Sequence, residues 1–286
     1  MIADDRLAHD LATEAGECLL ELRRRRGFGD AAALRAAGDR SSHDFLTAAL
    51  ASRRPDDAVL SEEGKDDPAR LAATRVWILD PLDGTREFGE EGRTDWAVHV
   101  ALWQRTSGGD GRLAAGAVAL PAHGQTFSTL PGHVGANRAG SNTDADVPHG
   151  LGATPAQPFG TIPRGTTAST GKLRVVVSRT RPPEFVRKLA AETGAELVPL
   201  GSAGAKIVLV LTGGVDAYIH AGGQHEWDSA APVAVVQAAG LHASRIDGRP
   251  LAYNQPDPRL PDILVCRPGI AGQLLAEIRA IRVREG

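Results

Sequence analysis

The sequence predicts a protein of two mixed α/β halves, and three observations support this fold class. Short apolar runs that end at glycine or proline alternate with longer segments of helical periodicity. Between the halves, residues 131–171 are rich in Gly, Ala, Thr, Pro and Asn and carry almost no large apolar side chain. The 286 residues suffice for one large domain or for two smaller ones that share a core.

The first half is expected to open with two helices and to continue with five strands. Residues 4–26 place leucines at helical spacing, and the arginines at 23–26 followed by Gly27 are typical of a helix C-terminus. A second helix is expected over about 41–52. A glycine-rich turn makes the third and fourth strands a hairpin. The strands are predicted at 58–61, 75–80, 96–103, 113–120 and 125–130.

The middle segment separates this half from a second run of alternating strands and helices. Because residues 131–171 cannot bury enough apolar surface to offset chain entropy, we expect a disordered linker there. Strands are then predicted at 173–177, 197–200 and 215–220 and near Leu241 and Ile263. Helices are predicted at about 183–193, 203–211 and 228–239 and from Ile270 onward. The expected domains are therefore 1–130, 131–171 and 172–286.

Composition excludes several classes of protein. The formal net charge of −3 argues against a general binder of nucleic-acid polymers or membrane surfaces. No apolar run approaches the roughly 20 residues of a membrane span, and the acidic N-terminus lacks the pattern of a signal peptide. Cys18 and Cys266 lie in apolar segments and offer neither a disulfide framework nor zinc-ligand spacing. We therefore expect a cytoplasmic protein.

The turn Asp80-Pro81-Leu82-Asp83-Gly84-Thr85 is the most informative motif. It follows the apolar run 76–79, so a buried strand delivers two carboxylates, a glycine and a hydroxyl into one corner. Pro81 fixes the backbone between the acids, and Gly84 permits a turn that a bulkier residue would obstruct. Two acids this close repel each other unless a cation lies between them, which predicts a site for hard metal ions. An ordinary Asx turn would explain one acid better than two.

Two further acids can complete an oxygen-rich cage with the acids of this turn. Glu62 ends another strand and Asp228 begins a helix, although alone they could be solvated charge and a helix N-cap. The backbone carbonyl of Leu82 could add a ligand. Magnesium prefers such oxygen ligands, whereas zinc would prefer His and Cys. Two ions about 3.5–4 Å apart would clamp the attacking and leaving oxygens of a displacement, and Thr85 could hold the attacking water.

These motifs carry a resemblance to a known family. Ser61-Glu62-Glu63, the acidic turn and Trp227-Asp228 resemble, in order and spacing, the inositol monophosphatase superfamily of magnesium-dependent, lithium-sensitive phosphatases. The resemblance implies an α+β fold, a layered αβαβα sandwich, and hydrolysis of a small phosphomonoester with two to three Mg²⁺ ions. Arg86-Glu87-Phe88 and Glu226-Trp227-Asp228 are most similar to the CysQ-type phosphatases acting on 3'-phosphoadenosine 5'-phosphate, especially their actinobacterial branch.

The resemblance also implies roles for individual residues. Thr85 would orient the attacking water, Glu62 would accept its proton, and Asp39 would hydrogen-bond the threonine. The implied metal ligands are Glu62, Asp80, Asp83, Asp228 and the carbonyl of Leu82. The implied substrate contacts are Asp83, Gly84, Thr85, Arg86, Ser178, Arg179, Ser202, Lys206 and Asp228.

Alternative functions remain open at this point. His220 stands where many nucleotide phosphatases have an arginine, and a neutral histidine would hold a second phosphate less firmly. The preferred reaction, conversion of 3'-phosphoadenosine 5'-phosphate to AMP in sulfate assimilation, therefore competes with hydrolysis of inositol 1-phosphate or fructose 1,6-bisphosphate. A non-catalytic, metal-dependent sensor of a phosphorylated metabolite is the alternative of another class. A homodimer would be in keeping with the family.

Overall fold

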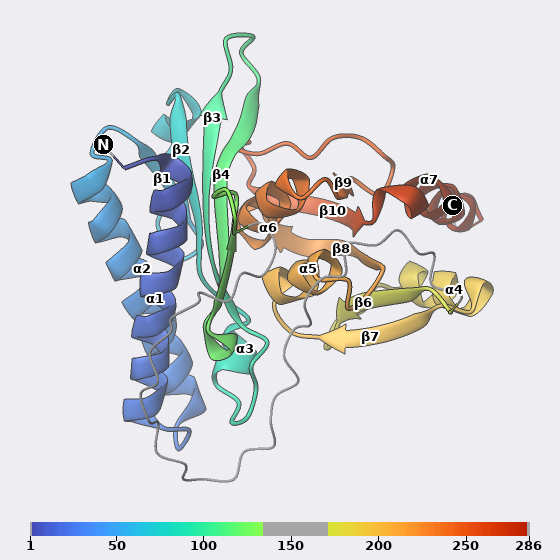
Figure 1. Ribbon diagram of the computed structural model, residues 1–286, viewed down its shortest axis with the longest axis horizontal. Helices are drawn as coiled ribbons and strands as arrows, with labels where there is room; N and C mark the ends of the chain where they lie inside the picture. The colour runs from blue at the N-terminus through green and yellow to red at the C-terminus, as the bar shows by residue number, and fades with distance from the viewer. Residues whose placement is uncertain (1, 134–170, 285–286) are drawn as a thin grey trace.

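The computed structural model describes residues 2–133 and 171–284. Two five-stranded sheets organise these residues (Figure 1). The first sheet has the strand order β1-β2-β3-β4-β5, with a parallel pair at β1 and β2 and antiparallel pairs elsewhere. The second sheet has the order β7-β6-β8-β10-β9 and is mixed. The linker predicted at 131–171 lies almost wholly outside the described residues.

The chain builds the first sheet and its covering helices before the second sheet. The elements of this part are α1 (Asp4–Arg26), α2 (Ala31–Arg53), β1 (Ala58–Ser61), the 3₁₀ helix η1 (Pro68–Leu71), β2 (Arg75–Asp83), α3 (Thr85–Phe88), β3 (Ala97–Arg105), β4 (Gly111–Leu120), the 3₁₀ helix η2 (Pro121–His123) and β5 (Gln125–Ser128).

The second part of the chain alternates strands and helices. Its elements are β6 (Arg174–Ser178), α4 (Glu184–Thr193), β7 (Glu196–Leu200), α5 (Ala203–Leu211), β8 (Ala217–His225), α6 (Glu226–Ala238), β9 (His242–Ser244), β10 (Arg259–Cys266) and α7 (Pro268–Val283).

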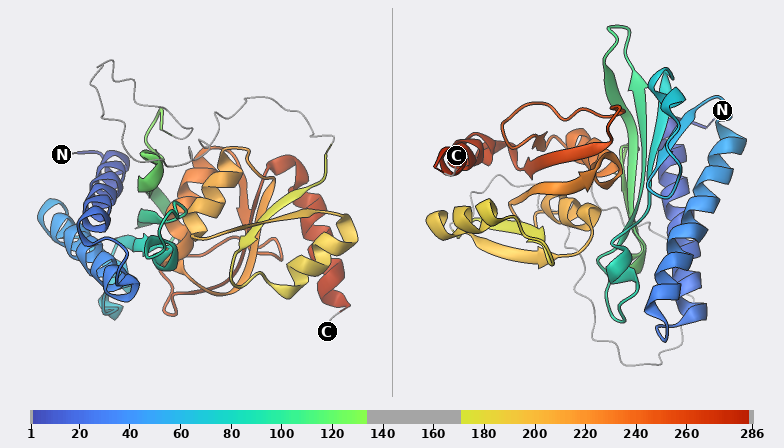
Figure 2. Two further views of the ribbon diagram at one scale, coloured as in Figure 1. Left: turned by 90° about the horizontal axis from the view of Figure 1, so that it is seen from below. Right: turned by 180° about the vertical axis from the view of Figure 1, so that it is seen from behind.

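Three apolar cores hold five layers together, in the order expected of an αβαβα sandwich. One core lies between the first sheet and helices α1 and α2. The largest places α5 and α6 between the two sheets, and the third packs α4 and α7 on the outer face of the second sheet. The views of Figure 2 show the same stacking from below and behind. The predicted α+β class and layering are confirmed.

Several predicted boundaries were wrong for local reasons. Helix α2 begins at Ala31 rather than near residue 41, because Asp30 caps it by accepting the N–H of Ala33 at 2.9 Å. Its glycine at position 38 lets the helix approach β2 and α3, where an added Cβ would lie 2.8 Å from Leu82 and 2.7 Å from the Phe88 ring. Strand β8 continues past residue 220 to His225, through two glycines with positive φ.

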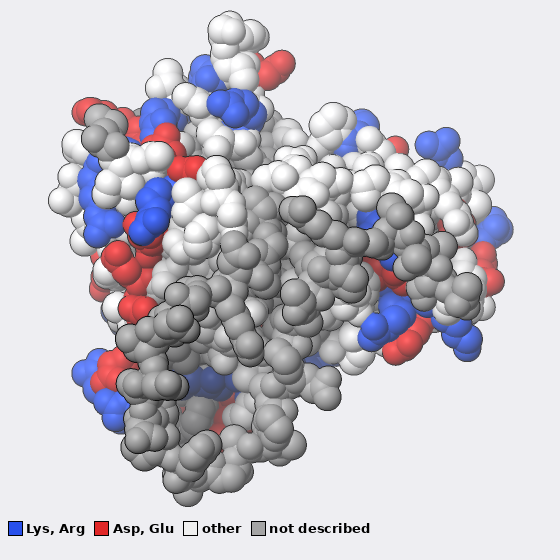
Figure 3. All heavy atoms as spheres, viewed as in Figure 1, with Lys and Arg blue, Asp and Glu red and all other residues white. Residues whose placement is uncertain are grey.

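The face of the molecule in Figure 3 shows no dominant charge. On the face in Figure 3, basic and acidic side chains are interspersed over both parts of the chain. Among the described residues no helix is long and apolar enough to cross a membrane.

Candidate active site

A cavity of about 310 Å³ lies where the two parts of the chain meet. It is lined by the end of β1, the turn from β2 into α3, the end of β6, the first turn of α5, strand β8 and the start of α6. All the side chains predicted as metal ligands or substrate contacts line this one cavity, namely Glu62, Asp80, Leu82, Asp83, Gly84, Thr85, Arg86, Ser178, Arg179, Ser202, Lys206 and Asp228.

An irregularity in the pairing of β2 with β3 shapes the acidic turn. Strand β2 pairs with β3 through Asp80 and again at Asp83, with an irregularity between them that includes Pro81. The N–H of Leu82 donates to the Asp80 carboxylate at 3.1 Å, which fixes that side chain. Gly84 has a φ of +86°, a left-handed conformation that favours glycine. The chain then enters the short helix α3 at Thr85.

The hydroxyl of Thr85 is held at the edge of the acidic cluster. Its oxygen lies 3.3 Å from an Asp39 carboxylate oxygen and 3.0 Å from the carbonyl oxygen of Leu82, so it can donate to either. Asp39 comes from α2 and does not line the cavity itself. Burial raises the pKa of Asp39 to about 6, with a contribution from Glu63. The predicted proximity of Asp39 and Thr85 is thus present in the structure.

Three of the four clustered carboxyl groups carry raised pKa values. Burial, with repulsion by Asp228, raises the pKa of Glu62 to about 7, although much of this residue faces solvent. Burial and repulsion by Asp83 raise the pKa of Asp228 to about 6, and burial also raises the pKa of Asp80. The basic side chains of the protein therefore do not balance the negative charge of this cluster. Its oxygen donors fit a hard cation such as Mg²⁺. A carboxylate oxygen of Asp80, one of Asp83 and a ring nitrogen of His99 lie within 4.8 Å of one another.

Asp83 differs because it has partners from both parts of the chain. Burial would raise its pKa, but His99, Lys206 and Ser202 outweigh that effect and lower it. The Ser202 hydroxyl donates to the Asp83 carboxylate at 2.6 Å, and the N–H of Gly204 donates at 2.7 Å. The first turn of α5 therefore fixes a carboxylate that belongs to β2.

Two predicted substrate contacts use their polar atoms within the protein. Besides its bond to Asp83, the Ser202 oxygen accepts the N–H of Ala205 at 2.9 Å as the N-cap of α5. The buried ammonium of Lys206 donates to the carbonyls of Gly201 and Ser202 at 3.1 and 2.6 Å. Both side chains line the cavity, and their contact with a substrate stays a prediction.

Three arginines and a neutral histidine surround the rest of the cavity. Arg86, Arg179 and Arg181 line it, and Arg179 pairs with Glu87 at 2.7 Å. Burial lowers the pKa of His220 to about 4, so its ring is uncharged near neutral pH. Its Nε2–H donates to the carbonyl of Gly222 at 2.9 Å, which leaves Nδ1 as an acceptor.

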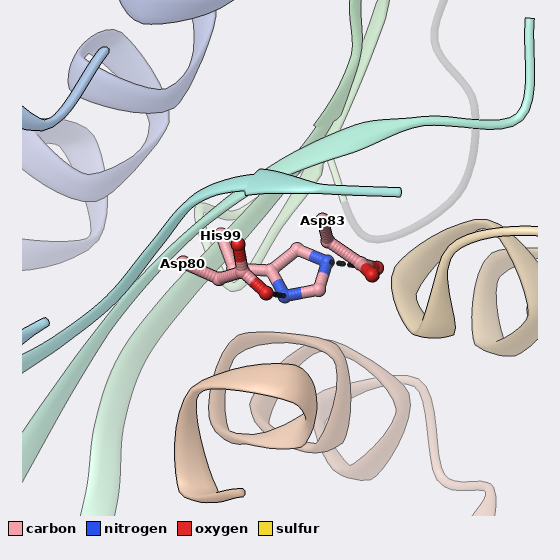
Figure 4. Close-up of side chains that lie close together, drawn as sticks. All are labelled: Asp80, Asp83 and His99. Atoms are coloured by element: carbon pink, nitrogen blue, oxygen red, sulfur yellow. Dashed lines mark ion pairs between the residues drawn. The ribbon is translucent and has the colours of Figure 1, made fainter. Parts of the chain in front are cut away.

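Sequence reasoning missed His99, which lies between the two acids of the turn (Figure 4). The residues around it in β3 predict strand packing, and no local pattern marks this histidine. Its position opposite Asp80 in the ladder between β2 and β3 is visible only after the strands are paired.

The layered fold and the carboxylate cluster are those of a phosphatase class that includes the inositol monophosphatases. A comparison with family models matches residues 4–282 to the inositol monophosphatase family. The chain belongs to this family, and the predicted membership is confirmed.

Relatives and solved structures agree with this assignment. The chain is 50% identical over 284 residues to the 3'-phosphoadenosine 5'-phosphate phosphatase of Mycobacterium leprae, covering 98% of this chain and 95% of that protein. It is 28% identical over 220 residues to the 3'(2'),5'-bisphosphate nucleotidase CysQ of Escherichia coli, covering 76% and 78%. Inositol monophosphatase II of Staphylococcus aureus superposes with a TM-score of 0.71 at 22% identity, covering 94% and 92%, and shows the same fold.

Proposed function

We propose that this protein is a magnesium-dependent phosphatase that converts 3'-phosphoadenosine 5'-phosphate and water to AMP and phosphate. The observation that carries the hydrolytic reaction is that four carboxylates and Thr85 line the same cavity, with the Thr85 hydroxyl held by Asp39. The substrate is suggested by the M. leprae relative of that name, which matches almost the full length of this chain.

Thr85, Asp39 and Glu62 have separate roles in the proposed hydrolysis. When the Thr85 hydroxyl donates to Asp39, its oxygen is free to accept a hydrogen bond from a water and to aim that water at phosphorus. The Glu62 carboxylate lines the same cavity and would take the proton that the water loses. The water oxygen then bonds to phosphorus as the bond to the ribose 3' oxygen breaks. That oxygen leaves and takes a proton from solvent, and Glu62 returns to solvent the proton that it accepted.

Glu62, Asp80, Asp83, Asp228 and the Leu82 carbonyl would hold two to three Mg²⁺ ions. Such ions would supply positive charge against the phosphate and favour an in-line displacement. The raised pKa values of three of these carboxyl groups support a cation there, because a bound cation stabilises the ionised form.

The arginines around the cavity support a substrate with a second phosphate. Arg86 and Arg181 carry charge on the cavity wall, and Arg179 is held there by Glu87. Uncharged His220 favours the rival substrates, because it contributes no charge to hold a second phosphate.

The test compares kcat/KM on 3'-phosphoadenosine 5'-phosphate, inositol 1-phosphate and fructose 1,6-bisphosphate with one enzyme preparation. We expect the nucleotide to give the highest value, chelation to stop phosphate release, and lithium to inhibit it. A higher value on inositol 1-phosphate would overturn the substrate while leaving the reaction intact. Binding of these compounds without phosphate release would favour the non-catalytic sensor.

We also propose a cytoplasmic homodimer. Cys18 and Cys266 are both free thiols, as is common in proteins of a reducing compartment. Sedimentation equilibrium should give a dimer mass, and a monomer mass at all accessible concentrations would overturn the dimer.

A further inference from the structure

His99 is a buried side chain that lies between the acidic turn of β2 and the start of α6. It lies on β3 and is 0% exposed. Its Nδ1 lies 3.1 Å from the carbonyl oxygen of Trp227, and its Nε2 lies 3.2 Å from the Asp83 carboxylate (Figure 4). Asp80 faces it across the ladder, with a carboxylate oxygen 3.9 Å from Nδ1.

The contact at Nδ1 fixes which ring nitrogen carries a hydrogen. The Trp227 carbonyl can only accept, so Nδ1 must carry a hydrogen and donate it. That carbonyl belongs to the peptide bond whose nitrogen is that of Asp228. The second nitrogen, Nε2, pairs with the Asp83 carboxylate when it also carries a hydrogen, as an ion pair. The protonated ring therefore links the Asp83 carboxylate to the backbone that carries Asp228, although the two acids come from different parts of the chain.

The first turn of α5 packs closely against the His99 ring. A Cβ added at Gly204 would lie 2.1 Å from Nε2 of His99, closer than any side chain can come. The N–H of Gly204 meanwhile donates to Asp83 at 2.7 Å. Glycine at this position lets α5 contact both the imidazole and the carboxylate, so β2, β3, α5 and α6 meet at His99.

We propose that His99 is a positioning residue that fixes Asp80, Asp83 and Asp228 relative to one another and thereby sets the affinity of the cavity for Mg²⁺. This inference rests on the proposed metal-dependent function. His99 itself does not line the cavity, so it acts through the carboxylates and not by contact with substrate. Groups that orient metal ligands in this way typically change metal affinity by about 10–100-fold when they are lost.

The test measures Mg²⁺ binding by calorimetry, without substrate, for wild type, His99→Leu and His99→Asn. Leucine loses both polar contacts, so we expect the dissociation constant to rise at least about tenfold. Asparagine can place an N–H near the position of Nδ1, so it should recover much of that loss. KM for substrate at saturating Mg²⁺ should change little. His9→Leu is the control, because His9 is a partly buried histidine whose ring contacts Ser128 and His133 and does not line the cavity.

A folded His99→Leu protein that binds Mg²⁺ as wild type does would overturn the proposal. If His99→Leu does not fold, Gly204→Ala provides the second variant, because its Cβ must displace the ring. We expect Gly204→Ala to weaken Mg²⁺ binding in the wild-type background and to have a smaller effect beside the shorter side chain of His99→Asn. Equal effects in both backgrounds would also overturn the proposal. A wild-type protein that binds Mg²⁺ but releases no phosphate would instead refute the proposed function.

Discussion

At the scale of single residues, Asp80 provides the most direct test of the metal site. We expect Asp80→Asn to abolish turnover at saturating Mg²⁺, because an amide has no charge to hold the cation. Burial and repulsion by Glu62 raise the pKa of Asp80, so the uncharged amide should leave the metal-free protein at least as stable as wild type. Phosphate release and thermal melting in a chelator measure the two effects. Near-normal turnover would contradict the assignment.

His220 gives a prediction on pH. The unfolded chain binds a proton at this histidine near pH 6.5 and the folded protein only near pH 4. Between these values the unfolded state holds more protons, so folding stability falls as the pH is lowered. Through His220 the wild-type free energy of unfolding should fall by about 2 kcal/mol between pH 8 and pH 5. His220→Gln should lack this part of the fall. Urea unfolding at both pH values measures this, and parallel losses in the two proteins would refute it.

At the scale of elements, the arginines that end α1 do not share one role. The sequence predicts all four as ordinary helix C-terminal charges. In the structure the guanidinium of Arg23 donates to the carbonyls of Glu90 and Arg93 at 2.6 and 2.9 Å. It also lies 4.8–5.6 Å from the centres of three aromatic rings, those of Phe28, Phe88 and Trp96. Arg23 thus ties α1 to the loop that follows α3.

We expect Arg23→Met to lower the free energy of unfolding by about 2 kcal/mol, because it leaves two loop carbonyls without their charged donor. Arg24→Met is the matched control on the same helix, because Arg24 pairs only with exposed Glu21. Its substitution should change stability little. Chemical denaturation of both variants measures the difference, and equal stabilities would show that the loop does not depend on Arg23.

Sequence patterns predicted the order and type of the elements better than their ends. The apolar run before Asp80 marks β2 because a buried strand must be apolar on both faces. The start of α2 was missed because the stretch 31–38 has five alanines and only one large apolar side chain, so it shows little amphipathic contrast. Alanine itself favours a helix, the Asp30 cap fixes where α2 begins, and Gly38 allows close packing, which is a tertiary effect.

At the scale of the whole molecule, sequence patterns again do not reveal tertiary contacts, and this explains which site residues could be predicted. Glu62, Asp80, Asp83 and Asp228 could be predicted because each lies in a motif with a recognisable sequence. His99 could not, because its partner Trp227 is 128 positions away and only the packing of β3 against α6 brings them together. The arginine in η1 is a second example, with a partner 184 positions away.

That arginine, Arg70, is 1% exposed and joins the first part of the chain to the start of α6. Its guanidinium donates to the side-chain oxygen of Asn254 at 2.7 Å and to the carbonyl of Gln255 at 2.9 Å. The backbone N–H groups of the same two residues donate to the buried carboxylate of Glu226 at 2.6 and 2.7 Å. Glu226 begins α6, two residues before Asp228, so the network anchors the helix that presents this predicted ligand.

We expect Arg70→Met to destabilise the protein by about 3 kcal/mol, because it leaves buried acceptors unpaired and the Glu226 carboxylate without its nearby cation. Arg259→Met is the control, because that arginine is exposed and pairs only with Asp257 near the same loop. Urea unfolding monitored by tryptophan fluorescence and by circular dichroism measures both variants. If the network joins the two parts of the chain, both signals should shift together in Arg70→Met. A stability equal to that of the control would mean that the packed layers alone hold α6 in place.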